Sequence, residues 1–261
     1  MQKTLLVTAL YDLYNFDQNE LIGDDDISKS KIPMTLNYRL EQLRNLLQCH
    51  VNMLLFVDPT IVKYLPEIPE YCNVVQMPLT GIKTFSKIKA LPNSVSVPDG
   101  ANPFKDTRSY FGLTNSKIDF VYLASQMLPQ YTHYAWVDAG LSKVFTANLD
   151  SFRPNIERLI NYPYENLIVA PTSSWQRMGP YEEINAGSPF WRFLGGIIIF
   201  PKDKIDQFSA LSKIILDNCI SKYNKLTWEV NVWAVIEAKF PELFYTYTAE
   251  HNETMASIPE K

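Results

Sequence analysis

One carboxylate, Asp138, comes directly after an apolar run and before two small residues, in the segment Trp-Val-Asp-Ala-Gly at 136–140. The aromatic and β-branched residues of 132–137 predict a buried strand. Ligands of open α/β sheets bind outside the carboxyl ends of the strands, where Asp138 would lie. Small residues after it would let a ligand approach closely. The pattern indicates either a ligand-binding carboxylate or an ordinary strand-ending turn, and other segments must decide.

Basic side chains stand near the start of the helix that should lead into this strand. Lys117 and Asp119 fall in the first turn of a helix predicted over 115–127, and Arg108 lies a few residues earlier. A helix start offers free N–H groups and the positive end of its dipole, and Arg and Lys suit phosphate oxygens. The segment predicts an anion site or, alternatively, a solvated helix start in which the dipole favours Asp119.

A glycine pair, Gly195-Gly196, enters a later apolar strand and would leave room for a ligand against the backbone, or else marks a bulge or close packing. Glu229 starts another helix, where it is a charge at the helix cap, a catalytic base or a ligand of the acceptor hydroxyl. Trp228 would be a sugar platform or, by default, a core residue. His251 follows the last strand. If it folds back to Asp138, the two offer an imidazole and a carboxylate to Mn²⁺ or Mg²⁺, completed by diphosphate oxygens.

The elements that must position these residues follow from hydrophobic periodicity. A strand at 5–10, a helix starting at 34 or 35 and a strand at 51–57 form a strand–helix–strand unit, which implies a parallel sheet. We expect irregular structure over 60–110, apart from a strand at 74–77, and a polar loop containing the acidic run 24–26. Further strands are predicted at 132–137, 166–171, 193–200 and 244–247, and further helices at 204–223 and from Thr227.

Composition narrows the class of protein. The chain has 261 residues, 46% of them hydrophobic and 20% charged, which fits one α/β domain over 1–261 with a mostly parallel central sheet flanked by helices. The formal net charge of −4 argues against binding a nucleic acid polymer. Three distant cysteines without CxxC spacing indicate a reducing compartment, so we expect a cytoplasmic protein. The N-terminal apolar run is interpreted as a strand, and we expect no transmembrane segment.

Taken together, these motifs resemble those of glycosyltransferases with the GT-A fold, and within that fold the HtrL/YibB-type group. The resemblance covers most of the chain and rests on the order and spacing of short motifs: the opening strand with Val7-Thr8-Ala9, Ser116-Lys117-Ile118, the segment around Asp138, the glycine pair, Thr227-Trp228-Glu229 and Glu250-His251-Asn252. GT-A enzymes hold a metal and the diphosphate of a nucleotide sugar with an Asp-x-Asp motif. Here the second carboxylate is replaced by Gly140, so Asp138 would contact the metal or only the ribose.

The resemblance implies a nucleotide-sugar donor, a divalent metal, and a glycan, lipid or protein acceptor. It places Thr8, Ala9 and Asp12 beside the nucleotide base and ribose, and gives His251 the place of a late metal ligand. Lys117 or Arg108 would stabilise the leaving diphosphate, and Glu229 would be the base of an inverting enzyme. Two alternatives stay open: a non-catalytic nucleotide-sugar-binding module and a sugar nucleotidyltransferase. The second normally has a Gly-rich basic loop after the first strand, which residues 11–14 do not show.

Overall fold

The apolar runs form the strands of one sheet in the computed structural model, which describes residues 3–13, 35–103, 105–179 and 187–259. The acidic run at 24–26 lies outside these residues. The strands are β1 (Thr4–Leu10), β2 (Met53–Val57), β3 (Cys72–Gln76), β4 (His133–Val137), β5 (Ile168–Thr172), β6 (Ile197–Pro201) and β7 (Phe244–Thr248). Their side chains are buried over both faces in β2, β4, β5 and β6, as expected for central strands of a sheet covered by helices.

The strand order is β3-β2-β1-β4-β6-β5-β7, and only β6 runs antiparallel to its neighbours. This confirms the α/β class and the mostly parallel sheet. The chain moves outward from β1 through β2 to β3, then returns to the other side of β1 with β4. The order therefore reverses between β1 and β4, and their carboxyl ends border the resulting crevice.

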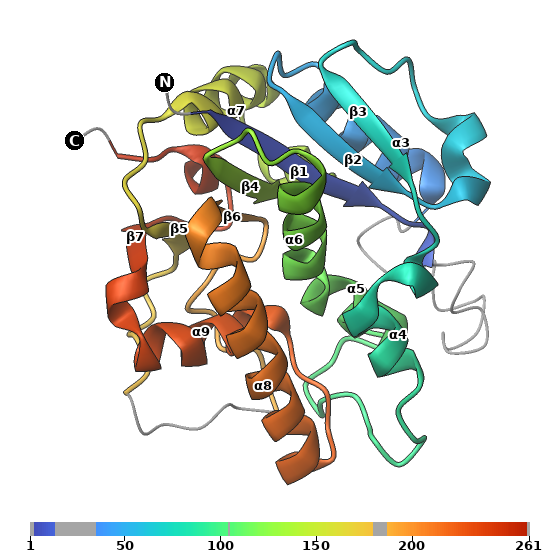
Figure 1. The fold of residues 1–261 in the computed structure, drawn as a ribbon, viewed down its shortest axis with the longest axis vertical. Coiled ribbons are helices and arrows are strands. Elements are labelled where there is room, and N and C mark those ends of the chain that lie inside the picture. The colour runs from blue at the N-terminus through green and yellow to red at the C-terminus, as the bar shows by residue number, and fades with distance from the viewer. Residues whose placement is uncertain (1–2, 14–34, 104, 180–186, 260–261) are drawn as a thin grey trace.

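Helices cover both faces of the sheet (Figure 1). On one face lie α3 (Leu36–Leu47) and α7 (Phe152–Asn161). The other face carries α4 (Lys83–Lys89), α5 (Arg108–Asn115), α6 (Lys117–Met127), α8 (Ile205–Tyr223) and α9 (Glu229–Lys239). Helix α3 shows how the sequence dictates this: Leu40, Leu43 and Leu47 recur on one face and are buried, and the Thr35 side chain accepts a hydrogen bond from the N–H of Tyr38 as its N-cap.

Some expectations need correction. Residues 83–89 and 108–115 are helical, although the prolines of 60–110 predicted irregular structure. Thr227 is not the N-cap of α9; that position belongs to Trp228, and the Thr227 hydroxyl accepts a hydrogen bond from Asn231. Within the described residues, no helix has the length and apolar character needed to cross a membrane.

Candidate active site at the carboxyl edge of the sheet

Asp138 lies where the strand order reverses. It follows β4 directly, and Asp12 lies two residues beyond the end of neighbouring β1. Antiparallel β6 brings the glycine pair to the same edge, where the N–H of Asp138 donates to the carbonyl oxygen of Gly196. The predicted position of Asp138 at the open end of a buried strand is thereby confirmed.

The ammonium of Lys117 joins three segments at this edge. It donates to the carbonyl oxygen of Gly195 at 2.7 Å and to Glu229 Oε1 at 2.9 Å, and lies 3.1 and 3.3 Å from the two oxygens of Asp138. The side chains of Lys117 and Glu229 are 7% and 8% exposed, whereas that of Asp138 is 38% exposed. We call Lys117, Asp138 and Glu229 the ion cluster. Within it, Asp138 is the carboxylate that reaches solvent.

Electrostatics favour the charged form of Lys117. Burial alone would lower the pKa of Lys117, but the carboxylates of Asp138 and Glu229 outweigh it, and the pKa of the ammonium is raised. The ammonium also lies 5.9 Å from the ring centroids of both Trp136 and Trp233. Trp136 Nε1 donates to Asp138 Oδ1 at 2.6 Å, the oxygen that also lies 3.1 Å from Lys117 Nζ, so both groups hold the carboxylate. The oxygens of Asp138 are thus held in place before any ligand arrives.

The glycine pair is required by close packing. A Cβ at Gly195 would lie 2.8 Å from Glu229 Oε1 and 3.1 Å from a methyl carbon of Val230. A Cβ at Gly196 would lie 2.8 Å from Leu141 Cδ1. These separations are shorter than normal contacts, so a larger residue at position 195 would displace Glu229 of the ion cluster, and one at position 196 would displace the side chain of Leu141. The close-packing alternative for these glycines is the one observed.

Further basic groups lie near Asp138. The pKa of Lys143 is lowered, first by desolvation and then by the charges of Lys105, Lys117 and Arg39, while Asp138 acts in the opposite direction. The pKa of His251 is lowered by desolvation and by Lys143 and Lys105, and again Asp138 opposes this. These groups are therefore near enough to act on one another electrostatically. A cluster of basic groups around one exposed carboxylate is suited to an anionic ligand that also offers hydroxyl groups.

Tyr110 lies near the carboxylates of the ion cluster, and Arg39 binds the backbone just after β1. Burial and the charges of Glu229, Asp106 and Asp138 raise the pKa of the Tyr110 hydroxyl, so it stays protonated and can donate a hydrogen bond. Arg39 donates to the carbonyl oxygen of Tyr11 at 2.7 Å; burial lowers the pKa of its guanidinium, and the charges of Asp12 and Tyr110 oppose this.

Two residues predicted to bind phosphate have other partners. The Arg108 guanidinium donates to the carbonyl oxygens of Leu91, Pro92 and Val95, at 2.6, 3.2 and 2.7 Å, and so ties down the preceding loop. Asp119 accepts from the N–H of Thr84 at 2.9 Å and lies 3.1 Å from Lys213 Nζ. Both side chains are committed to holding neighbouring segments together, and we assign neither to the site.

Residues expected beside the nucleotide fall at the right edge but differ in access. Thr8 is fully buried, and its hydroxyl has no hydrogen-bond partner among the described residues. Asp12 is also buried, and Ala9 is partly exposed. Trp228 is 5% exposed and packs edge-to-face on Phe111 with ring centroids 5.3 Å apart, so the predicted sugar platform is a core residue.

Sequence reasoning missed Lys105, Lys143, Arg39 and Tyr110. Lys143 follows Asp138 by five residues in a short 3₁₀ helix (Leu141–Val144), which gives a weak local signal. Arg39 lies in α3 and looks like an ordinary polar position of an amphipathic helix. These four residues come together only because the chain folds back to the carboxyl end of β1.

Asp138 and His251 are the predicted ligands of a divalent ion. Both lie at this edge, but the Asp138 oxygens already bind Lys117 and Trp136. Within the residues that the structure describes, no group of three or more His, Cys, Asp or Glu side chains could hold an ion. The protein donors therefore do not form a metal site by themselves, and metal binding by Asp138 and His251 stays a prediction for the substrate-bound state.

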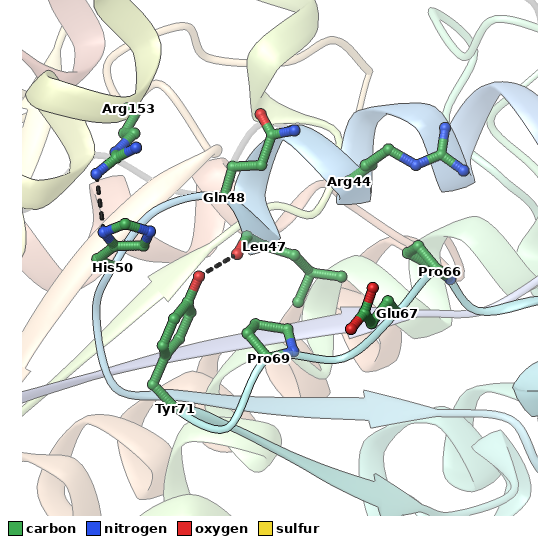
Figure 2. A pocket seen from close by; sticks show the side chains of 9 residues that line it. All are labelled: Arg44, Leu47, Gln48, His50, Pro66, Glu67, Pro69, Tyr71 and Arg153. Atoms are coloured by element: carbon green, nitrogen blue, oxygen red, sulfur yellow. Dashed lines mark hydrogen bonds between the residues drawn. The ribbon is translucent and has the colours of Figure 1, made fainter.

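A pocket of about 480 Å³ lies at the opposite edge of the sheet, at the amino ends of β2 and β3 (Figure 2). It is formed by the end of α3 and the residues leading into β2 and β3. Arg153 reaches it from α7, and its Nη2 lies 2.8 Å from Nδ1 of His50. The residues that line it are Arg44, Leu47, Gln48, His50, Pro66, Glu67, Pro69, Tyr71 and Arg153. None of the predicted site residues is among them.

No protein-family model matches the sequence, and no curated protein matches it in sequence. Solved structures similar to it include a glycosyltransferase involved in glycosylation of the major capsid of PBCV-1 (TM-score 0.43, 11% identity, covering 94% of this chain and 81% of that one). Another is the apo-form glycosyltransferase GlyE of Streptococcus pneumoniae TIGR4 (TM-score 0.41, 12% identity, covering 95% of this chain and 45% of that one). The chain thus spans less than half of GlyE. Likeness at this level assigns neither an activity nor a residue, and membership of the HtrL/YibB-type group stays a prediction.

Proposed function

We propose that this protein is a glycosyltransferase that moves a sugar from a nucleotide-diphosphate donor to a hydroxyl of a glycan, lipid or protein. The observation that carries the proposal is Asp138: a solvent-reaching carboxylate at the reversal of strand order, fixed by Lys117 and Trp136 and surrounded by basic groups. A nucleotide sugar combines a diphosphate, which needs cations, with ribose and sugar hydroxyls, which donate to a carboxylate.

Sugar transfer requires the carboxyl edge of the sheet to stabilise a leaving anion. The bond between the anomeric carbon and the phosphate oxygen breaks, and the nucleotide diphosphate leaves with the electron pair. The acceptor oxygen forms the new bond to that carbon, and its proton passes to a base. Lys143, Lys105 and Arg39 would receive the diphosphate charge, and preorganised cations of this kind lower the barrier without reorganising in the reaction. Asp138 would accept hydrogen bonds from hydroxyls of the donor.

Glu229 receives a different role from the one predicted. A base must reach the acceptor hydroxyl within hydrogen-bond distance, but the Glu229 side chain is 8% exposed and its Oε1 accepts from Lys117. We assign it to positioning Lys117, and through it Asp138. A divalent ion belongs to the proposal only with oxygens supplied by the diphosphate, because the protein donors are too few.

A non-catalytic nucleotide-sugar-binding module is the second candidate. The buried position of Glu229 favours it, since this leaves the base of an inverting reaction unassigned. Release of free nucleotide diphosphate from a bound donor, with or without an acceptor, separates an enzyme from a binding module. Release of pyrophosphate from a nucleoside triphosphate and a sugar phosphate would instead identify a nucleotidyltransferase.

The test is calorimetry with a panel of nucleotide sugars, using wild-type protein, Asp138→Asn and the control Asp150→Asn, which changes an exposed carboxylate elsewhere. We expect one donor to bind wild type and the control equally, and Asp138→Asn to bind it at least about tenfold more weakly while it remains folded at the temperature of the titration. Equal binding by Asp138→Asn would overturn the assignment of Asp138. Failure of folded wild-type protein to bind any donor would overturn the function.

The same titrations with Mn²⁺, with Mg²⁺ and with excess chelator test the ion. Stronger binding with either metal supports the predicted ion, and identical binding in chelator removes it. Glu229→Gln separates its two roles: a base role requires transfer to fall while donor affinity is kept, whereas a positioning role lowers both together.

A further inference from the structure

Two indoles stand exposed at the edge of the sheet that carries Asp138. Trp175 follows the end of β5, and Trp191 lies six residues before β6. Their exposed fractions are 48% and 46%, unusually high for tryptophan. Since the carboxyl end of β5 and the amino end of β6 meet at this edge, both lie on the same edge as Asp138 and the glycine pair.

The backbones that carry the two indoles are tied to each other. The N–H of Ser173 donates to the carbonyl oxygen of Arg192 at 3.0 Å, and the Ser173 hydroxyl donates to the carbonyl oxygen of Trp191. Arg192 Nη1 returns to the carbonyl oxygen of Trp175 at 3.0 Å. The ring of Trp175 packs edge-to-face on Phe190, the residue next to Trp191, at 5.4 Å. The indoles are therefore held in one neighbourhood on a fixed frame.

That frame is anchored in the protein interior. Arg192 makes a two-pronged ion pair with Glu237 of α9, at 2.9 and 2.8 Å, with side chains 15% and 4% exposed. On the same helix, Asn231 accepts from the N–H of Phe190 and donates to the carbonyl oxygen of Ser188 at 3.0 Å. Helix α9 also supplies Glu229 to the ion cluster, so one helix anchors both the cluster and the indoles.

We propose that Trp175 and Trp191 form the acceptor-binding surface of the transferase and that its acceptor is a carbohydrate; this rests on the proposed function. A pyranose has flat faces of C–H groups and a rim of hydroxyls, and a rigid indole fits such a face at low entropic cost. A lipid surface would need a broad apolar patch, whereas the exposed neighbours of Trp175 in the chain, Ser174, Gln176 and Arg177, are polar. Trp228, for which the sequence offered a sugar platform as the alternative to a core residue, is buried.

The experiment measures binding of maltohexaose, cellohexaose and chitohexaose by calorimetry to wild type, Trp175→Ala, Trp191→Ala and the control Tyr122→Ala. Tyr122 is an exposed aromatic residue of α6. We expect one oligosaccharide to bind wild type and the control equally, and each Trp→Ala variant to bind it about tenfold more weakly. Trp191→Phe, which keeps an aromatic face, should recover part of the affinity if Trp191→Ala proves unstable.

Donor titrations of the same proteins separate this proposal from the function. Unchanged donor binding in the Trp→Ala variants, with oligosaccharide binding lost, supports a distinct acceptor surface. Oligosaccharide binding that is unaffected by both substitutions overturns the proposal while leaving the transferase in place. So does a wild type that binds none of the three oligosaccharides, or indole fluorescence that responds instead to phosphatidylcholine–phosphatidylglycerol vesicles. Oligosaccharide binding through the indoles without any donor binding would overturn the transferase, and with it the acceptor role, and would leave a carbohydrate-binding surface.

Discussion

The two edges of the sheet each carry a cation between other polar groups, but in different surroundings. At the carboxyl edge, Lys117 is 7% exposed and pairs with Asp138, Glu229 and a backbone carbonyl. At the amino edge, Arg153 is 49% exposed and donates to Glu157 at 2.8 Å beside His50. Similar residue types thus make a buried, preorganised cluster in one place and a solvated pair in the other.

Burial is what gives the first arrangement its consequences. A buried charge that loses its partner keeps its desolvation penalty, whereas a surface charge is compensated by water and salt. The ion cluster can therefore hold Asp138 in one position for a ligand. The pocket at the amino edge (Figure 2) has only exposed charges to orient a ligand.

The largest difference in stability is expected between variants that each lack the cation of one edge. Lys117→Met leaves two carboxylates without their shared partner, and breaking a buried pair of this kind costs about 3–5 kcal/mol of the free energy of unfolding. Arg153→Met, the matched change at the amino edge, should cost about 0–1 kcal/mol. Urea unfolding of the two variants measures the difference.

A second substitution tests whether charge is the reason. Adding Glu229→Gln to Lys117→Met removes one of the two uncompensated charges and should recover part of the lost stability. Equal losses in Lys117→Met and Arg153→Met would show that burial does not distinguish the two edges.

The next effect tests the packing beneath the ion cluster. Gly195→Ala places a Cβ 2.8 Å from Glu229 Oε1, so the cluster or the strand must shift, and overpacking of this kind costs about 1–3 kcal/mol. Gly140→Ala is the control at the same edge: nothing lies within 4 Å of its added Cβ, and its φ of −92° suits alanine. Its stability should stay within about 0.5 kcal/mol of wild type.

Donor binding sharpens the same comparison. Gly195→Ala should weaken binding of any donor found for wild type, because the position of Asp138 depends on the cluster, whereas Gly140→Ala leaves that position unchanged. A Gly195→Ala variant as stable and as active as the Gly140→Ala control would show that close packing at the ion cluster is unimportant.

The sequence predicted most of the strands because their burial on both faces requires continuous apolar runs, as in β2 and β6. It failed for α4, α5 and α7. Pro154 falls in the first turn of α7, where a proline is tolerated, so its presence does not argue against a helix. The prolines between residues 60 and 103 lie in loops and turns outside α4 and α5.

For the site, the strand-end rule located Asp138, and the motifs around it also indicated Lys117, Gly195 and Glu229, which the fold brings together. The sequence could not show which of Lys117 and Asp119 reaches the site. Residues two apart on a helix point to different sides, so only one of them can face it. Arg108 binds carbonyls that no local pattern identifies. Trp175 and Trp191 differ from Trp228 only in burial, which the tertiary structure decides.

The smallest effect distinguishes the two edges by pH. The backbone N–H of His50, which donates to Glu157 Oε1 at 2.9 Å, lowers the pKa of Glu157; burial opposes this, and Arg153 adds to it. A lowered pKa means that the folded state favours the ionised form, so the stabilisation is present above the ordinary carboxyl range and is lost as pH falls through the folded-state pKa. Lys117 has a raised pKa, so its contribution is lost only as pH rises into the alkaline range.

Glu157→Gln should therefore cost less than about 1 kcal/mol at pH 7, and its difference from wild type should shrink as the pH falls from about 5 to about 3. Urea unfolding of both proteins at pH 7 and pH 3.5 measures this, each pair compared at one pH. A difference that stays constant would mean that the Glu157 carboxylate contributes no charge-dependent stability. The charges at the amino edge would then add nothing measurable to stability, and the contrast with the ion cluster at the carboxyl edge would be larger.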